Sequence, residues 1–224
     1  MNVCLFDIDG TLLASGGAGK AAMETALTVA FGVTRLAGQV PFSGRTDRAI
    51  GRDLFRLHGI DDTPANWQRF VAAYLALLPG CLARHQGRVL PGIASFLDRL
   101  RAEGSFLVGL LTGNLRAGAE RKLSHYGLWH HFSFGGFGDH HLERDDVARE
   151  ALAEVRRLLN GTVALDRVWV IGDTPLDIQC ARCIGVRVAA VATGWHSLDE
   201  LARSAPDLLL PDLADPTPLL TQWR

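Results

Sequence analysis

The clearest candidates for chemistry in this 224-residue sequence are aspartates that occur in closely spaced pairs. Asp7 and Asp9 are two residues apart and precede Gly10, which permits a tight loop. Asp173 and Asp177 are four residues apart in the segment GDTPLD. Carboxylates that share one site repel each other and require a cation, and oxygen ligands suit Mg²⁺, which also takes a phosphate oxygen from a substrate. The alternative is that each aspartate only caps a helix or ends a turn.

The elements that must position these residues are short apolar runs separated by helical patterns. Strands are predicted at residues 3–6, 105–111, 168–171, 186–191 and 208–210, with a sixth at 132–134. Helices are predicted at residues 93–103, 117–126 and 147–159, where apolar residues recur at helical spacing. This alternation predicts the α/β class, with a doubly wound parallel sheet and helices on both faces.

Residues 15–87 interrupt the alternation. They carry helical patterns at 20–31, 47–58 and 65–78 and no convincing strand. We therefore expect two domains, a core of residues 1–14 and 88–224 and an all-helical cap of residues 15–87 inserted after the first strand. Gly16, Gly17 and Gly87 at the edges of the insert suggest hinges.

Polar residues follow several of the predicted strands. In open parallel sheets, ligands bind beyond the carboxyl ends of the strands. Asp7, Asp9, Thr112 and Asp173 all lie at or just after such ends. We expect them to converge in space although they are far apart in the sequence.

The motifs DIDGTL, LLTGN and IGDTPLD, in this order, resemble those of the haloacid dehalogenase (HAD) superfamily, and specifically its phosphatases. The resemblance spans nearly the whole chain, because the helical insert also lies where that family places a C1-type cap. Phosphoglycolate phosphatase-like members are the nearest likeness. It implies a Mg²⁺-dependent hydrolase of small phosphate esters, with a Rossmann-like core.

The resemblance also implies roles for individual residues. Asp7 would be the nucleophile, would form an aspartyl-phosphate and would bind Mg²⁺. Asp9 would act as general acid and base and would bind the metal through its backbone carbonyl. Asp173 would hold Mg²⁺, and Asp177 would support the metal shell. Thr112, with the amides of Gly113 and Asn114, would bind the transferring phosphoryl group.

One departure from the family pattern concerns a lysine that these phosphatases commonly carry before the last motif. The chain has only Lys20 and Lys122, and neither is expected near the aspartates. Arg144, just before a predicted helix, is the candidate substitute. Its guanidinium supplies a permanent charge but not the geometry of an ammonium. The alternative is that Arg144 is a solvated residue at the start of the helix.

Other polar features have two interpretations each. In relatives with this type of cap, a loop such as 43–47 reaches the active site, where Arg45 would bind a carboxylate or a second phosphate of the substrate. The alternative is that this segment only caps a helix. His140 and His141 are interpreted as loop residues near the site rather than metal ligands. Cys180 and Cys183 are interpreted as buried cysteines in a helix, not as a redox or metal pair.

Composition narrows the class of protein further. The formal net charge is −1, which indicates neither nucleic-acid nor membrane-surface binding. No apolar run is long enough to span a bilayer, and the N-terminus does not resemble a signal peptide, so we expect a cytoplasmic enzyme. Its partner is expected to be a small phosphate ester, and the chain to be a monomer or small homo-oligomer.

Two alternative functions share these motifs. A phosphomutase of the β-phosphoglucomutase type would form the same aspartyl-phosphate but return the phosphoryl group to a sugar. A catalytically weak binding or regulatory protein would keep the scaffold, and the missing lysine is its only support.

Overall fold

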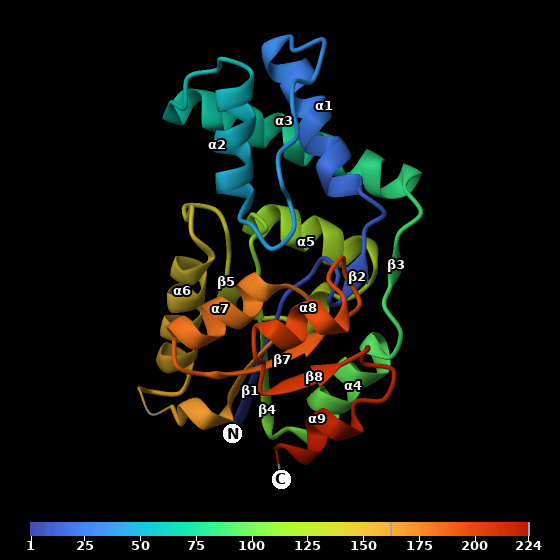
Figure 1. Ribbon diagram of the computed structural model, residues 1–224, viewed down its shortest axis with the longest axis vertical. Helices are drawn as coiled ribbons and strands as arrows, with labels where there is room; N and C mark the ends of the chain where they lie inside the picture. The colour runs from blue at the N-terminus through green and yellow to red at the C-terminus, as the bar shows by residue number, and fades with distance from the viewer. Residues whose placement is uncertain (162, 224) are drawn as a thin grey trace.

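A parallel sheet of six strands forms the centre of the protein, which the computed structural model describes over residues 1–161 and 163–223 (Figure 1). The strand order is β5-β4-β1-β6-β7-β8, and every neighbouring pair is parallel. The strands are β1 (Asn2–Phe6), β4 (Phe106–Leu111), β5 (Gly135–Gly136), β6 (Val168–Gly172), β7 (Arg187–Val191) and β8 (Leu208–Leu210). The predicted α/β class and parallel sheet are confirmed.

Helices cover both faces of this sheet, because side chains of each strand alternate between two apolar layers. Phe6 packs in one layer and Leu5 in the other. The first layer includes α4 (Ile93–Glu103), α5 (Arg116–His125) and α9 (Thr217–Thr221). The second includes α6 (Arg144–Leu158), α7 (Pro175–Cys183) and α8 (Leu198–Arg203). Two short 3₁₀ turns, η1 (Trp129–His131) and η2 (Leu165–Arg167), complete the connections.

One segment differs from the sequence-based expectation. The sixth strand is Gly135–Gly136 and not the predicted 132–134. A Cβ on Gly136 would lie 2.3 Å from the Val147 carbonyl oxygen in α6, so the strand passes too close to α6 for a side chain at this position. The C-terminal residues form α9, which packs on the sheet. The Trp223 ring lies 5.0 Å from the Phe106 ring, centroid to centroid.

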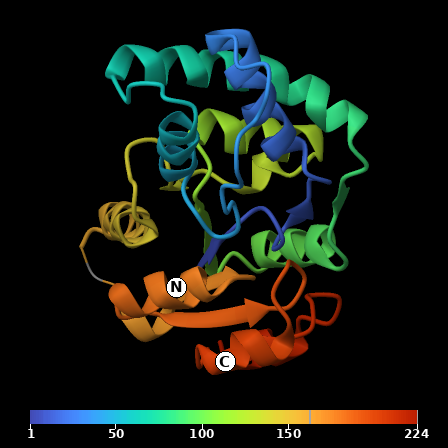
Figure 2. The ribbon, with the colours of Figure 1, turned by 45° about the horizontal axis from the view of Figure 1, so that its top comes forward.

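The chain between β2 (Leu13–Ala14) and β3 (Arg88–Val89) is helical throughout its regular structure. These two short strands pair antiparallel, so the chain enters and leaves the helical segment at neighbouring positions. It contains α1 (Ala18–Phe31), α2 (Asp47–Leu57) and α3 (Pro64–Arg84), which share an apolar core of their own around Phe55, Phe70 and Tyr74. In both views α3 crosses above α5, and both termini lie at the opposite end of the molecule (Figures 1 and 2).

The described helices include none that is both long and apolar enough to cross a membrane. All four cysteines are free. Cys180 is buried, as expected, whereas Cys183 is exposed.

Candidate active site

Three buried aspartates meet at the carboxyl end of the central strands. Asp7, Asp173 and Asp177 each present a carboxylate oxygen, and these oxygens all lie within 4.8 Å of one another. Asp7 directly follows β1, Asp173 follows β6, and Asp177 lies in the first turn of α7. The Asp7 amide donates to the Ile171 carbonyl at 2.9 Å, which continues the pairing of β1 with β6. Neighbouring parallel strands thus bring Asp7 and Asp173 together, whereas Asp9 and Thr112 lie in a neighbouring group.

Glycines allow the loops to close around Asp173. Gly10 has φ +92°, and a Cβ at this position would lie 2.3 Å from Asp173 Oδ2. A Cβ on Gly194, in the loop after β7, would lie 1.8 Å from the same oxygen. Thr11 Oγ1 donates to Asp173 Oδ1 at 3.1 Å. The Asp173 carboxylate is therefore enclosed by backbone that admits no side chain at two positions.

Both carboxylate oxygens of Asp177 accept hydrogen bonds from protein groups. Its Oδ2 accepts from the Thr174 amide at 3.0 Å and from Thr174 Oγ1 at 2.7 Å, which forms the capping box of α7. Its Oδ1 accepts from Arg144 Nη2 at 2.5 Å. Both carboxylate oxygens have partners, so Asp177 positions Arg144 and starts α7. A direct bond from Asp177 to a metal ion would compete with these contacts.

Arg144 lies at the centre of the cluster. It is 6% exposed, so the alternative of a solvated residue at the start of the helix is wrong. Its Nη2 lies 2.9 Å from Asp7 Oδ1, and its Nη1 donates to the Gly44 carbonyl at 3.1 Å. Arg144 therefore joins Asp7, Asp177 and the loop of the helical segment with one planar group.

The charge of this cluster is not balanced by the protein. Burial raises the pKa of Asp7 to about 6, although Arg144 opposes the shift, and the charges of Asp177 and Asp9 add to it. Burial and the charges of Asp7 and Asp177 also hold the pKa of Asp173 well above its usual range. The donors are all carboxylate oxygens, which are hard ligands. A divalent cation such as Mg²⁺ fits this donor set and would relieve the repulsion.

Asp9 belongs to a second, neighbouring group of polar side chains. Its side chain is 36% exposed, and its Oδ1 accepts from Ser15 Oγ at 3.0 Å. Its Oδ2 accepts from Asn114 Nδ2 at 3.1 Å and from Lys122 Nζ at 2.5 Å. Asn114 Nδ2 also donates to Thr112 Oγ1 at 2.9 Å. The predicted residues Asp9, Thr112 and Asn114 thus form one hydrogen-bonded network.

Lys122 is the residue that the sequence-based interpretation missed. It was expected away from the site, but its side chain is only 6% exposed and its ammonium contacts Asp9 and, at 2.6 Å, Asn114 Oδ1. The signal was available: Lys122 lies on the same face of α5 as the buried residues Ala119 and Leu123. A lysine on an apolar helix face requires a partner, and here that partner is Asp9.

The charges of this second group compensate each other. Burial opposes ionisation of Asp9, but the Lys122 ammonium and hydrogen bonds from Asn114 and Ser15 hold its pKa below its ordinary value. Burial likewise opposes protonation of Lys122, yet Asp9 and Asp47 raise its pKa above the usual range. Asp7 and Asp9, two residues apart, are therefore shifted in opposite directions.

The loop before α2 is docked onto the turn after β4. The Asp47 amide donates to the Gly113 carbonyl at 2.7 Å, and Asp47 Oδ2 accepts from the Leu115 amide at 2.8 Å. A Cβ on Gly113 would lie 2.1 Å from the Arg45 carbonyl oxygen, so this close contact requires glycine. Thr46 Oγ1 caps α2 through the Ala49 amide at 3.1 Å. The helix-capping interpretation of this segment is therefore confirmed, and the loop also reaches the site.

Arg45 is held within the helical segment. Its Nη2 lies 2.7 Å from Asp53 Oδ2 in α2, and its Nη1 donates to the Pro41 carbonyl at 3.1 Å. Among the described residues no contact joins its guanidinium to the three buried aspartates. The structure thus brings the Arg45 backbone, but not its charge, to Gly113. Elsewhere, His141 Nε2 lies 2.7 Å from Glu150.

Comparison with known proteins supplies independent information. The family model described as haloacid dehalogenase-like hydrolase matches residues 4–182. A phosphoglycolate phosphatase from Synechococcus elongatus is 28% identical over 231 residues, covering 99% of this chain and 98% of that protein. A probable phosphatase, IndB, from Dickeya dadantii is 28% identical over 216 residues, covering 92% of this chain and 87% of that protein.

Solved structures share the fold. A mutant of CbbY from Rhodobacter sphaeroides, solved in complex with xylulose-(1,5)-bisphosphate, superposes with a TM-score of 0.76 at 19% identity and 96% coverage of both chains. A hydrolase from Pseudomonas syringae superposes with a TM-score of 0.72 at 20% identity and 99% coverage of both chains.

The buried Asp47 carboxyl generates a prediction about stability. Burial raises its pKa to about 7, although Lys122 and the Leu115 amide oppose the shift. Between its ordinary pKa of 3.8 and about 7 the native state therefore holds a proton that the unfolded chain has lost. The free energy of unfolding should fall as the pH rises through this window, because the unfolded state binds fewer protons.

Asp47→Asn keeps an oxygen acceptor for the Leu115 amide but cannot ionise. Its stability advantage over the wild type should grow by about 2–3 kcal/mol between pH 5 and pH 8. Urea unfolding of both proteins across this range measures the difference. Parallel curves for the two proteins would contradict the prediction.

Proposed function

Because this chain belongs to the haloacid dehalogenase-like hydrolase family, we propose that it hydrolyses phosphate monoesters of small metabolites with Mg²⁺ as its cofactor. The observation that carries the proposal is Asp7, a buried carboxylate at the end of β1 with Arg144 at 2.9 Å and Asp9 two residues on. The family match and the two phosphatase relatives identify the chain as a phosphatase. The named relative suggests phosphoglycolate or a similar small phosphate, or a sugar phosphate, as the substrate class.

Asp7 is the proposed nucleophile. One of its oxygens attacks the phosphorus, the bond from phosphorus to the alcohol oxygen breaks, and an aspartyl-phosphate forms on Asp7. Water then attacks this phosphorus and releases inorganic phosphate together with the regenerated carboxylate. Arg144 keeps a positive charge beside both the carboxylate and the arriving phosphoryl group, which reduces the repulsion between two anions.

Asp9 is the proposed general acid and base. It would protonate the departing alkoxide and then take a proton from the attacking water. Its side chain is 36% exposed, so solvent and a leaving group can reach it. Lys122 and Asn114 fix its orientation through hydrogen bonds to Oδ2.

The cation would be held by Asp7, Asp173 and the backbone carbonyl of Asp9. Asp177 would support this arrangement through Arg144 and through water, since its own oxygens are taken. Bound Mg²⁺ would neutralise negative charge on the carboxylates and on the phosphoryl oxygens. Thr112 and the amides of Gly113 and Asn114 are the proposed donors to those oxygens.

The helical segment of residues 15–87 is the proposed cap, and residues 1–14 and 88–224 the proposed core. The separate apolar core of α1–α3 and the two strands β2 and β3 at its base support this division. Arg45 would recognise the leaving group once it exchanges Asp53 for a substrate anion. A cytoplasmic location and a monomer or small homo-oligomer complete the proposal.

Phosphate release from a panel of monoesters tests the function. The panel contains phosphoglycolate, hexose phosphates and a nucleoside monophosphate, with and without Mg²⁺. Asp7→Asn should lower the rate by at least about 10³-fold, as expected when a covalent path is lost. Isomerisation of a sugar phosphate without net phosphate release would instead identify a mutase. Turnover of no ester above the Asp7→Asn background would overturn the proposal.

Arg144→Lys tests the geometry of the guanidinium. Lysine has the charge but cannot join Asp7, Asp177 and Gly44 at once, so kcat should fall on the order of 10²-fold. The kcat of Arg144→Met should fall further, because the buried carboxylates of Asp7 and Asp177 lose their positively charged partner. The kcat values of both variants are measured by phosphate release at saturating substrate, with circular dichroism as the folding control. Equal rates for the lysine variant and the wild type would contradict this role.

Lys122→Met tests the anchor of Asp9. Losing the ammonium should lower kcat by about 10–100-fold, part of the contribution of a positioned acid or base, with a smaller change in KM. Lys122→Arg should recover part of the loss. Lys20→Met is the matched control, because Lys20 is exposed on α1 and its ion-pair partner is Glu24, outside the site. A KM effect of the same size as the kcat effect would indicate substrate binding instead.

A further inference from the structure

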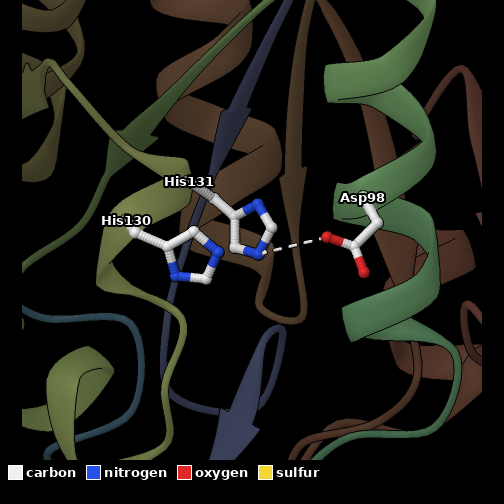
Figure 3. Close-up of side chains that lie close together, drawn as sticks. All are labelled: Asp98, His130 and His131. Carbon is white, nitrogen blue, oxygen red and sulfur yellow. Dashed lines mark ion pairs between the residues drawn. The ribbon is translucent and has the colours of Figure 1, made fainter.

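A second group of metal-ligating side chains lies apart from the aspartate cluster, where η1 faces α4 (Figure 3). Asp98 comes from the middle of α4, and His130 and His131 form the end of η1. Each offers one ligand atom, and the three atoms lie within 4.8 Å of one another. The function proposed above uses none of these residues.

His131 has the buried side chain of the pair that faces α4. Its side chain is 5% exposed, and its Nδ1 is buried without a hydrogen-bond partner among the described residues. Its Nε2 points toward Asp98, with Oδ1 at 3.9 Å (Figure 3). That distance is too long for a hydrogen bond. A buried imidazole therefore directs a nitrogen at a carboxylate without bonding to it.

The distance suits a bridging cation. Two ligands that each lie about 2.0–2.1 Å from a tetrahedral ion are separated by about 3.3 Å, so a small rotation of Asp98 would close the gap. Asp98 is free to rotate, because 72% of its side chain is exposed. The His130 ring lies beside that of His131, with centroids 3.9 Å apart.

The three donor atoms indicate which metal ion would bind. Two imidazole nitrogens and one carboxylate oxygen favour Zn²⁺ over Mg²⁺, which prefers oxygen ligands and retains water. Three protein ligands and one open position are a common arrangement for Zn²⁺. We propose that Asp98, His130 and His131 form a Zn²⁺ site that ties η1 to α4.

Two neighbouring features lower the expected affinity of this group for Zn²⁺. Arg101, one turn after Asp98 on α4, places a positive charge near His131. The buried Nδ1 has no partner among the described residues to orient the ring, whereas most metal-ligating histidines have one. Both features weaken binding relative to a closed structural site. Zn²⁺ would therefore exchange with solution.

Zinc binding by the full chain tests the proposal, with excess Mg²⁺ present to occupy the aspartate cluster. Titration against a chromophoric chelator should show one Zn²⁺ per chain, and Co²⁺ in its place should give the visible spectrum of a nitrogen-ligated ion. Asp98→Asn and His131→Gln should each raise Kd by more than about tenfold, since even outer partners of metal ligands contribute about 10–100-fold.

The double variant His140→Ala/His141→Ala is the matched control, because it removes another adjacent histidine pair and should leave Kd unchanged. Zn²⁺ should raise the melting temperature of the wild type and of this control but not of Asp98→Asn, whose exposed position keeps the fold intact. Absence of a Zn²⁺ equivalent sensitive to Asp98 and His131, or equal loss in the control, would overturn the proposal. Mg²⁺-dependent phosphate release should be unchanged in Asp98→Asn, which separates this site from the proposed function.

Discussion

The structure depends on the burial of several negative charges at one end of a parallel sheet, with a single guanidinium to oppose them. Three carboxylates approach within 4.8 Å, and burial alone would favour their neutral forms. Neighbouring residues offset the electrostatic cost of this group. Arg144 bonds two of the carboxylates, the capping box of α7 satisfies Asp177, and glycines 10 and 194 leave room for Asp173. The negative charge that remains would be neutralised by the divalent cation of the proposed function.

The same guanidinium connects the charged centre to the helical segment. Arg144 donates to the Gly44 carbonyl, and Asp47 exchanges hydrogen bonds with Gly113 and Leu115. Movement of the loop 43–47 away from the sheet would therefore break contacts made by Arg144 and by the turn that carries Thr112. Because Lys122 lies near both Asp9 and Asp47, it also links Asp9, just after β1, to the first turn of α2. In the proposed enzyme, substrate entry and the state of the catalytic groups would thus be coupled by a few short contacts.

Much of this arrangement could be predicted from the sequence. Apolar runs that end in polar motifs defined the central strands, and parallel pairing then required Asp7, Thr112 and Asp173 to lie at one edge. The position of β5 could not be found, because Gly135–Gly136 has no side-chain signal and depends on the close passage of α6. Lys122 was missed because a charged residue in a helix is usually solvated. The position of the Arg45 side chain was not predicted. Only the backbone of Arg45 reaches the site, because its guanidinium pairs with Asp53, and the sequence alone did not indicate this ion pair.

The opposite pKa shifts of Asp7 and Asp9 suit the different roles proposed for these two neighbouring aspartates. A nucleophile must be ionised, yet burial raises the pKa of Asp7 to about 6, so its attack requires the positive charges around it. Asp9 begins as a carboxylate held by Lys122, which suits the base that takes a proton from water. To act first as an acid it must gain a proton, and a phosphate dianion bound beside it favours that change, because like charge disfavours the ionised form. The substrate itself would therefore prepare Asp9 for the first step, and its departure as a free alcohol would leave Asp9 ready for the second.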